Sequence, residues 1–121
     1  MPVKTKTLGK INSFIRKVGL DRREVTLKLI ELQRDVEDLQ NITNKIRKEI
    51  ISSQKEITNN GYLIQKKKKY TFLLQEQIDI ACNRIEFLEK EIEFSKNQLR
   101  LHTKKEDLLQ DKLKKLSLAE N

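Results

Sequence analysis

The 121-residue sequence has little of what enzymes and compact globular domains are built from. It contains no tryptophan, one proline, one cysteine, one histidine and three glycines, and only 5% of its residues are aromatic. A single cysteine excludes an internal disulfide and CxxC metal motifs. With one cysteine and one histidine in the chain, we expect no zinc site. The sequence shows no catalytic constellation and no glycine-rich phosphate loop. We therefore expect no enzyme activity, no metal and no cofactor.

Long apolar runs are missing as well. No segment approaches the roughly 20 apolar residues that a membrane-spanning helix requires. The lysines near the N-terminus are not followed by the apolar block of a secretory signal. We expect a cytoplasmic protein that does not insert into membranes.

The second half of the chain contains a heptad pattern instead. Positions that alternate four and three residues apart recur from Leu74 to Leu116, and all but three of them are apolar. These positions are Leu74, Ile78, Ala81, Ile85, Leu88, Ile92, Ser95, Leu99, His102, Glu106, Leu109, Leu113 and Leu116. A repeat that averages about 3.5 residues keeps one face of a helix against a partner helix and implies a left-handed coiled coil. This face is called the seam below.

The first half carries the same alternation, and Asn59-Asn60-Gly61 separates the two halves. Its seam positions are Val25, Leu29, Leu32, Val36, Leu39, Thr43, Ile46, Ile50, Ser53 and Ile57, and the phase extends back through Arg22, Val18, Ile15 and Ile11 to Leu8. Asn and Gly favour turns, and a short turn between two long helices makes them antiparallel neighbours. The sequence therefore predicts an all-α single domain, an antiparallel two-helix coiled-coil hairpin with a short N-terminal helical segment.

The predicted boundaries are a flexible tail over 1–7, helices over 22–58 and 62–117, and a turn over 59–61. Residues 8–19 form either a short helix or an extension of the first helix, because Gly19 is able to end a helix. A turn centred near residue 62 places Thr43 opposite Ala81 and Arg22 opposite His102.

A second set of apolar residues runs along the second helix outside the seam. Its members are seven residues apart and are called the apolar row: Leu73, Ile80, Phe87, Phe94, Leu101 and Leu108. They lie well over 100° around the helix from the centre of the seam, so one partner helix cannot cover both faces. We interpret the row as a face for another protein or a second copy. The alternative is that the N-terminal segment folds across it.

The net charge of +8 is concentrated in two patches. Residues 1–23 carry seven basic residues and one acidic residue, and residues 66–69 are four consecutive lysines. Such patches favour an acidic protein surface, a nucleic acid or an anionic lipid, and the simpler alternative is solvated charge that keeps a coiled coil soluble.

A basic, 121-residue helical hairpin with a loose N-terminal segment resembles the small stalk proteins of bacterial type III secretion, the YscO/FliJ (SctO) family. The resemblance covers nearly the whole chain and is carried by the two helices and the Asn59-Asn60-Gly61 turn. The segment Leu20-Asp21-Arg22-Arg23-Glu24 resembles the charged start of the first helix in such proteins.

The resemblance implies a non-enzymatic stalk that links the secretion ATPase hexamer to the export gate, at the periphery of an inner-membrane export apparatus. Some members of the family also bind escort chaperones. By this analogy the open end would enter the ATPase through Lys10, Arg16, Lys17, Arg22 and Arg23. The turn end would face the gate through Tyr62, Lys66, Lys67, Lys68, Lys69, Tyr70 and Phe72.

Two other functions stay open. The first is a self-associating helical chaperone or scaffold, in which the apolar row is buried in a dimeric four-helix bundle. The second is a binder of nucleic acid or anionic membranes, for which we expect only non-specific, salt-dependent binding through the lysines. We expect a monomer, with a dimer as the alternative.

Overall fold

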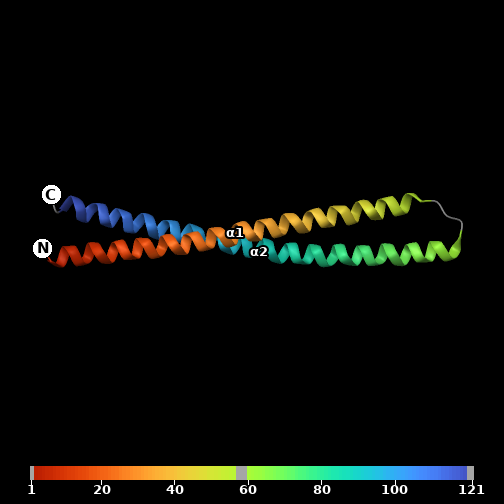
Figure 1. Cartoon of the computed structure of the whole chain (residues 1–121), viewed down its shortest axis with the longest axis horizontal. Coiled ribbons are helices and arrows are strands. Elements are labelled where there is room, and N and C mark those ends of the chain that lie inside the picture. Colours follow the sequence, from red (N-terminus) through yellow and green to blue (C-terminus); the bar gives the residue numbers. More distant parts are fainter. Residues whose placement is uncertain (1, 57–59, 120–121) are drawn as a thin grey trace. The chain divides into compact units, whose positions relative to one another are not determined.

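The computed structural model describes the backbone of residues 2–56 and 60–119 and the side chains of residues 6–56 and 60–118. Its two helices, α1 (Pro2–Lys55) and α2 (Gly61–Ala119), run antiparallel and pack against each other as a hairpin (Figure 1). The predicted all-α hairpin is therefore confirmed.

The start of α1 differs from the prediction. The helix begins at Pro2, so the described part of the predicted tail is helical, and residues 8–19 extend α1 without a break. Proline is compatible with the first turn of a helix because its missing N–H has no partner there in any case. No described glycine has a positive φ, and a glycine inside a helix costs only about 1 kcal/mol. Seam contacts on both sides of Gly19 outweigh that cost.

The predicted turn is partly described, because residues 57–59 lie outside the described part of the chain. The Asn60 side-chain oxygen accepts hydrogen bonds from the Tyr62 and Leu63 N–H groups, at 3.0 and 3.4 Å. Asn60 is thus the N-cap of α2, which satisfies amide groups that have no partner within the helix. Gly61 is the first residue of α2 and, like the other described glycines, has no positive φ.

Packing divides the chain into two units, which are described separately. The terminal unit consists of residues 1–31 and 92–121, and the turn unit consists of residues 32–91. Each unit pairs part of α1 with part of α2.

In the terminal unit, Ile11 and Ser95 are the buried seam positions, with 7% and 0% of their surface exposed. The other seam positions described in this unit are half-buried: Leu8, Ile15, Val18, Arg22, Val25, Leu29, Ile92, Leu99, His102, Glu106, Leu109, Leu113 and Leu116. The unit is therefore held by a narrow apolar contact with polar groups in it.

In the turn unit, five seam positions are buried: Val36, Thr43, Leu74, Ile78 and Leu88. Thr43 satisfies its hydroxyl by donating to the Leu39 carbonyl oxygen at 2.8 Å. The remaining seam positions described in this unit are half-buried: Leu32, Leu39, Ile46, Ile50, Ser53, Ala81 and Ile85. The heptad pattern thus identified the packed face of both helices, and Ile57 lies outside the described residues.

The pairing of the helices agrees with the predicted register to within one helical turn. Thr43, predicted opposite Ala81, lines a cavity together with Cys82 and Ile85. In the same register Ser53 faces Thr71, and both residues line a second cavity.

Candidate interaction site

The turn-end lysines lie in the second and third turns of α2, where the Asn60 cap places them. Four consecutive residues on a helix point in directions about 100° apart, so Lys66, Lys67, Lys68 and Lys69 surround the helix and do not share one face. Lys67 is half-buried against α1, and the other three are exposed.

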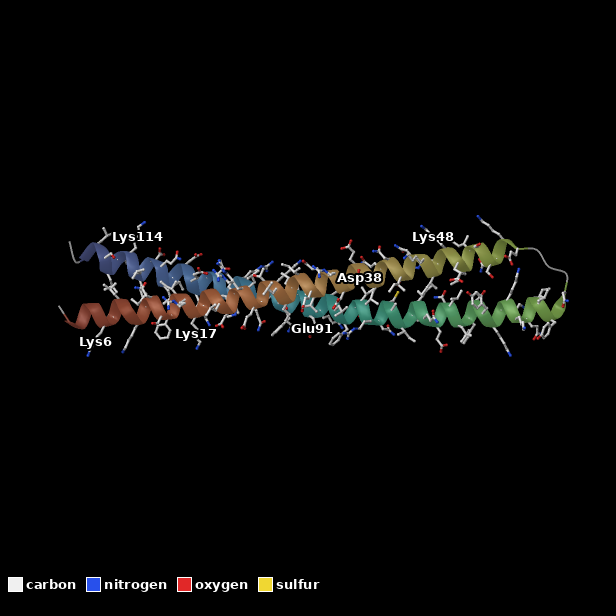
Figure 2. The ribbon with its side chains drawn as sticks, in the orientation of Figure 1. Lys6, Lys17, Asp38, Lys48, Glu91 and Lys114 are labelled. Carbon is white, nitrogen blue, oxygen red and sulfur yellow. The ribbon has the colours of Figure 1, made fainter. Side chains whose placement is uncertain are left out.

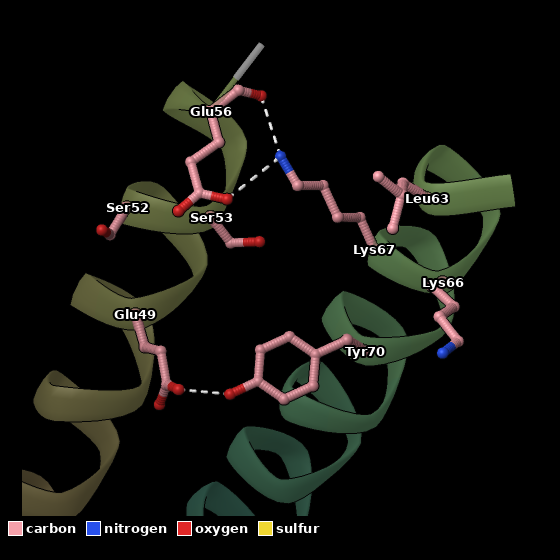
Figure 3. Close-up of a pocket in the computed structure, with 8 residues that line it drawn as sticks. All are labelled: Glu49, Ser52, Ser53, Glu56, Leu63, Lys66, Lys67 and Tyr70. Carbon is pink, nitrogen blue, oxygen red and sulfur yellow. Dashed lines mark hydrogen bonds and ion pairs between the residues drawn. The ribbon is translucent and has the colours of Figure 1, made fainter. Parts of the chain in front are cut away.

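Lys67 joins the two helices of the turn unit. Its ammonium group lies 2.9 Å from the Glu56 carbonyl oxygen, to which it donates a hydrogen bond, and 3.4 Å from the Glu56 carboxylate (Figure 3). One side chain thereby binds the backbone and the charge of the residue that follows α1. Lys67 is therefore engaged in a contact within the hairpin.

Tyr70 makes a second contact between the helices by donating its hydroxyl hydrogen to the Glu49 carboxylate (Figure 3). This hydrogen bond raises the pKa of the Tyr70 phenol above its ordinary value of 10.0, and desolvation and the negative charge of Glu49 act in the same direction. The phenol therefore stays protonated at neutral pH and keeps its role as donor.

An open cavity of about 600 Å³ lies between the helices at this point. It is lined by Glu49, Ser52, Ser53, Glu56, Leu63, Lys66, Lys67 and Tyr70 (Figure 3). Of the seven predicted turn-end residues, the structure brings Lys66, Lys67 and Tyr70 together here. Glu49 and Glu56 were not among the predicted site residues. The predicted register places Glu56 opposite Lys68, next to Lys67, but it places Glu49 opposite Gln75, five residues from Tyr70, so only the first contact had a signal in the sequence.

The remaining turn-end residues face solvent. Tyr62 and Phe72 expose 67% and 68% of their surface, and the Lys66 ammonium lies over the Tyr62 ring at 5.0 Å from its centre. Lys68 and Lys69 make no ion pair or hydrogen bond with any described residue. This surface therefore combines free cations with exposed aromatic rings.

Every member of the apolar row is exposed. Leu73, Ile80 and Phe87 of the turn unit expose 55%, 66% and 52% of their surface. Phe94, Leu101 and Leu108 of the terminal unit expose 56%, 61% and 59%. The alternative in which the N-terminal segment covers the row is therefore wrong, because that segment forms α1 and packs along the seam.

Two members of the row have charged or apolar neighbours. The Arg84 guanidinium lies over the Phe87 ring at 5.3 Å from its centre. In the terminal unit Phe14 of α1 lines a cavity with Leu108, and Lys17 and His102 contribute to the same cavity. Phe14, which is 55% exposed, was not among the predicted contacts, and the signal in the sequence is an aromatic residue directly before the seam position Ile15.

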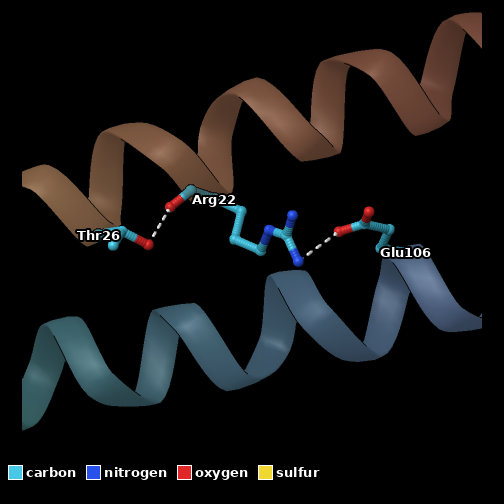
Figure 4. Close-up of polar contacts among 3 residues, drawn as sticks. All are labelled: Arg22, Thr26 and Glu106. Carbon is cyan, nitrogen blue, oxygen red and sulfur yellow. Dashed lines mark hydrogen bonds and ion pairs between the residues drawn. The ribbon is translucent and has the colours of Figure 1, made fainter.

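The five predicted open-end residues fall into two groups. Lys10, Arg16, Lys17 and Arg23 are exposed, whereas Arg22 is half-buried and its guanidinium lies 3.3 Å from the Glu106 carboxylate (Figure 4). Figure 2 shows the neighbouring Lys6 pointing away from α2, as it also shows for Lys48 of the turn unit. The open end thus keeps exposed cations, but Arg22 belongs to the contact between the helices.

Arg22, His102 and Glu106 are polar positions of the seam, and Arg22 contacts a different residue of α2 from the one predicted opposite it. Arg22 was expected to meet His102, and its long side chain reaches Glu106, one turn further along α2. The Arg22 carbonyl oxygen accepts a hydrogen bond from the Thr26 hydroxyl at 2.8 Å (Figure 4). His102 Nδ1 and Glu106 Oε2 are buried without a hydrogen-bond partner, so the ion pair with Arg22 is what compensates the buried Glu106 oxygen.

Within the described residues, no group of three or more His, Cys, Asp or Glu side chains is arranged to hold a metal ion. None of the described helices contains a stretch long and apolar enough to cross a membrane. Cys82 is exposed.

Comparisons with protein-family models, with curated proteins and with solved structures find no match for this chain.

Proposed function

We propose that the chain is a non-enzymatic coiled-coil stalk that links a type III secretion ATPase to the export gate, with escort chaperones as further partners. The observation that carries the proposal is that each of the two units has an exposed cationic surface. The apolar side chains of the seam are buried or half-buried between the helices. A protein that bridges two acidic partners needs two separate contact surfaces of this kind.

The roles of the two units follow from the analogy with the stalk family. The terminal unit would enter the ATPase through Lys10, Arg16, Lys17 and Arg23. The turn unit would meet the export gate through the lysines and aromatic residues at the start of α2. The exposed apolar row would be left for a chaperone. Arg22 would not take part in this contact, because it pairs with Glu106.

The proposal is tested in the host of this chain by deleting its gene and measuring export of type III substrates. We expect deletion to abolish export. The proposal is overturned if export is unchanged, or if the host genome encodes no type III secretion ATPase.

A matched pair of variants tests the ATPase contact. The triple variant Lys10→Gln/Lys17→Gln/Arg23→Gln removes three exposed cations from α1, and Lys96→Gln/Arg100→Gln/Lys104→Gln removes three from α2 of the same unit. We expect the first to bind the purified ATPase about tenfold more weakly, because charges at the rim of an interface steer association. Equal binding by the two variants would contradict the assignment of the open end.

The alternative function is a self-associating scaffold, and the exposed apolar row is the observation that favours it. The row reads Leu-Ile-Phe-Phe-Leu-Leu, which is nearly the same in both directions. In a two-fold interface between antiparallel copies of α2, residue i contacts residue j and j contacts i, so a row of this kind would pair Phe with Phe and aliphatic side chains with aliphatic ones. This alternative predicts a dimer that Phe87→Ser/Phe94→Ser dissociates and Leu20→Ser/Leu27→Ser leaves intact. Analytical ultracentrifugation distinguishes these outcomes.

A further inference from the structure

We propose that the turn end of the hairpin is a peripheral binding surface for an anionic lipid bilayer. The surface, called the basic-aromatic patch, is made of exposed residues distributed around the start of α2: Tyr62, Leu63, Lys66, Lys68, Lys69, Tyr70 and Phe72. The inference goes beyond the stalk proposal, which requires contact with proteins only, and it stands whether or not the chain belongs to a secretion system.

The segments on either side of the turn carry a strong positive charge. Residues 45–56 and 60–72 contain eight basic and two acidic residues, and this net charge of +6 compares with +8 for the whole chain. Glu56 is paired with Lys67, and Glu49 accepts the Tyr70 hydrogen bond while keeping its charge. With eight basic residues against these two, the charge at the turn end is mainly positive. A cluster of this size close to a negatively charged leaflet is attracted to it.

The side of α2 that faces away from α1 carries exposed lysine and apolar side chains. Thr71 and Leu74 are half-buried and buried, which marks the side of α2 that faces α1. Residues on the opposite side are exposed and recur at intervals of four and three: Tyr62, Lys66, Lys69 and Leu73. The outer face of the helix thus presents two lysines between Tyr62 and Leu73.

The exposed rings suit the boundary between lipid headgroups and acyl chains. Tyr62, Phe72 and Tyr70 expose 67%, 68% and 44% of their surface, and Leu63 exposes 46%. Tyrosine rings and lysine ammonium groups partition to the headgroup level, while Phe and Leu side chains insert more deeply. Lys66 already lies over the Tyr62 ring, so the cation and the ring enter the interface together.

The same features disfavour a nucleic acid as the occupant. A single strand is held in a groove where bases stack on aromatic rings along a cationic backbone track. The cavity at the turn end is not such a groove, because neither Tyr62 nor Phe72 lines it. A bilayer surface needs no groove. Because no described helix is able to cross a membrane, binding would be peripheral.

Vesicle sedimentation with the purified full chain tests the inference. Vesicles of phosphatidylcholine alone are compared with vesicles that also contain phosphatidylglycerol, at low and high salt. We expect binding to the anionic vesicles only, and weaker binding at high salt because surface charges are then screened. Circular dichroism of each variant below verifies that the helices are retained.

Two variants and their controls locate the site. Lys66→Gln/Lys68→Gln/Lys69→Gln should lower the partition coefficient on the order of a hundredfold, because each lysine near an anionic leaflet strengthens binding about fivefold. The charge-matched control Lys104→Gln/Lys112→Gln/Lys114→Gln in the terminal unit should bind as the wild type does. Tyr62→Ser/Phe72→Ser should lose most of the binding that persists at high salt, and Leu20→Ser/Leu27→Ser should keep it.

Three outcomes would overturn the inference: no binding to anionic vesicles, equal binding to neutral vesicles, or equal losses in the two lysine triples. A fourth is binding to single-stranded DNA without binding to vesicles, which would assign the patch to nucleic acid. Because the assay contains only protein and lipid, its failure leaves the secretion phenotype of the gene deletion as a separate test of the stalk proposal.

Discussion

At the scale of single residues, the polar positions of the seam need explanation more than the apolar ones. Ser95 is the least exposed residue of the described chain, and Glu106 exposes 15% of its side chain beside Arg22. A carboxylate in such a place is tolerated when a cation compensates it, and removing the cation alone leaves a poorly solvated charge. We therefore expect the Arg22–Glu106 pair to contribute more to the alignment of the two helices than to the free energy of unfolding.

Two variants at Arg22 and Glu106 measure how much the ion pair contributes to stability. Arg22→Ala should lower the free energy of unfolding by about 1 kcal/mol, a small value because the Arg22 side chain is 42% exposed and screened by water. Arg22→Leu/Glu106→Leu should be as stable as the wild type or more stable, since apolar side chains replace both charges. Urea unfolding followed by circular dichroism gives both values. A double variant less stable than Arg22→Ala would contradict this interpretation.

The hydrogen bond between Tyr70 and Glu49 stabilises the turn unit in a way that is lost at alkaline pH. The hydrogen bond to Glu49 raises the pKa of Tyr70 in the folded chain above its unfolded value near 10.0. The stabilisation is therefore complete below that unfolded value and is lost as the pH rises through the folded pKa. Tyr70→Phe should remove this loss, and Tyr62→Phe should keep it.

The ultraviolet absorbance of the phenolate, recorded during a pH titration, checks the same point directly. In Tyr62→Phe, where Tyr70 is the tyrosine that remains, the phenol should ionise at a higher pH than a free tyrosine. Ionisation of this phenol at the pH of a free tyrosine would mean that the Glu49 contact does not form in solution.

At the scale of helices, the spacing of apolar residues was sufficient to predict which face of each helix is packed. Every described seam position is buried or half-buried, because a 3.5-residue repeat admits only one such face. The helix ends were less predictable, since capping and glycine penalties are worth about 1 kcal/mol each and packing readily overrides them. Helix α1 begins at Pro2 and continues through Gly19, which shows packing overriding a glycine penalty. Helix α2 begins after Asn60, whose side chain caps it, which shows a local signal setting a helix end.

The site was harder to predict than the fold for a related reason. The periodicity gives the directions of side chains but not their reach, so it missed that Arg22 extends one turn to Glu106 and that Lys67 bonds Glu56. The apolar row was found because six residues seven apart are a strong pattern, while its occupant depends on a partner that the sequence does not contain.

Ile78 and Ile80 separate the two faces of α2 in one experiment. Ile78 is 3% exposed in the seam and Ile80 is 66% exposed in the apolar row. Ile78→Ala should lower the free energy of unfolding by roughly 2–4 kcal/mol, because it leaves a cavity, and Ile80→Ala should change it by less than about 0.5 kcal/mol. Chemical denaturation measures both. Similar losses at the two positions would mean that the row is buried in solution.

The continuity of α1 is tested at Gly19. Nothing lies within 4 Å of where an added Cβ would be, and the residue is helical. Gly19→Ala should therefore stabilise the chain by about 0.5–1 kcal/mol, and Gly9→Ala, which is equally open, should act in the same direction. The denaturation midpoint reports the change. Destabilisation by Gly19→Ala would indicate a break in the helix at this residue.

At the scale of the whole molecule, the distribution of charge and apolar surface defines what a partner would meet. Residues 1–23 and the turn-end segments each carry a net charge of +6, and the remainder of the chain carries −4. The seam occupies the apolar positions between the helices, and the apolar row is left outside it. A row of six exposed side chains that includes two Phe residues exceeds ordinary surface apolarity. Whether a second copy covers it decides between the stalk and the scaffold.

The most direct test of the stalk account is the mass of the purified chain in solution, measured by light scattering during size exclusion at low and high salt. The account predicts a monomer of 14.4 kDa at both salt concentrations, with the apolar row free for a partner. A dimer that persists at high salt and is abolished by Phe87→Ser/Phe94→Ser would contradict it and assign the row to self-association.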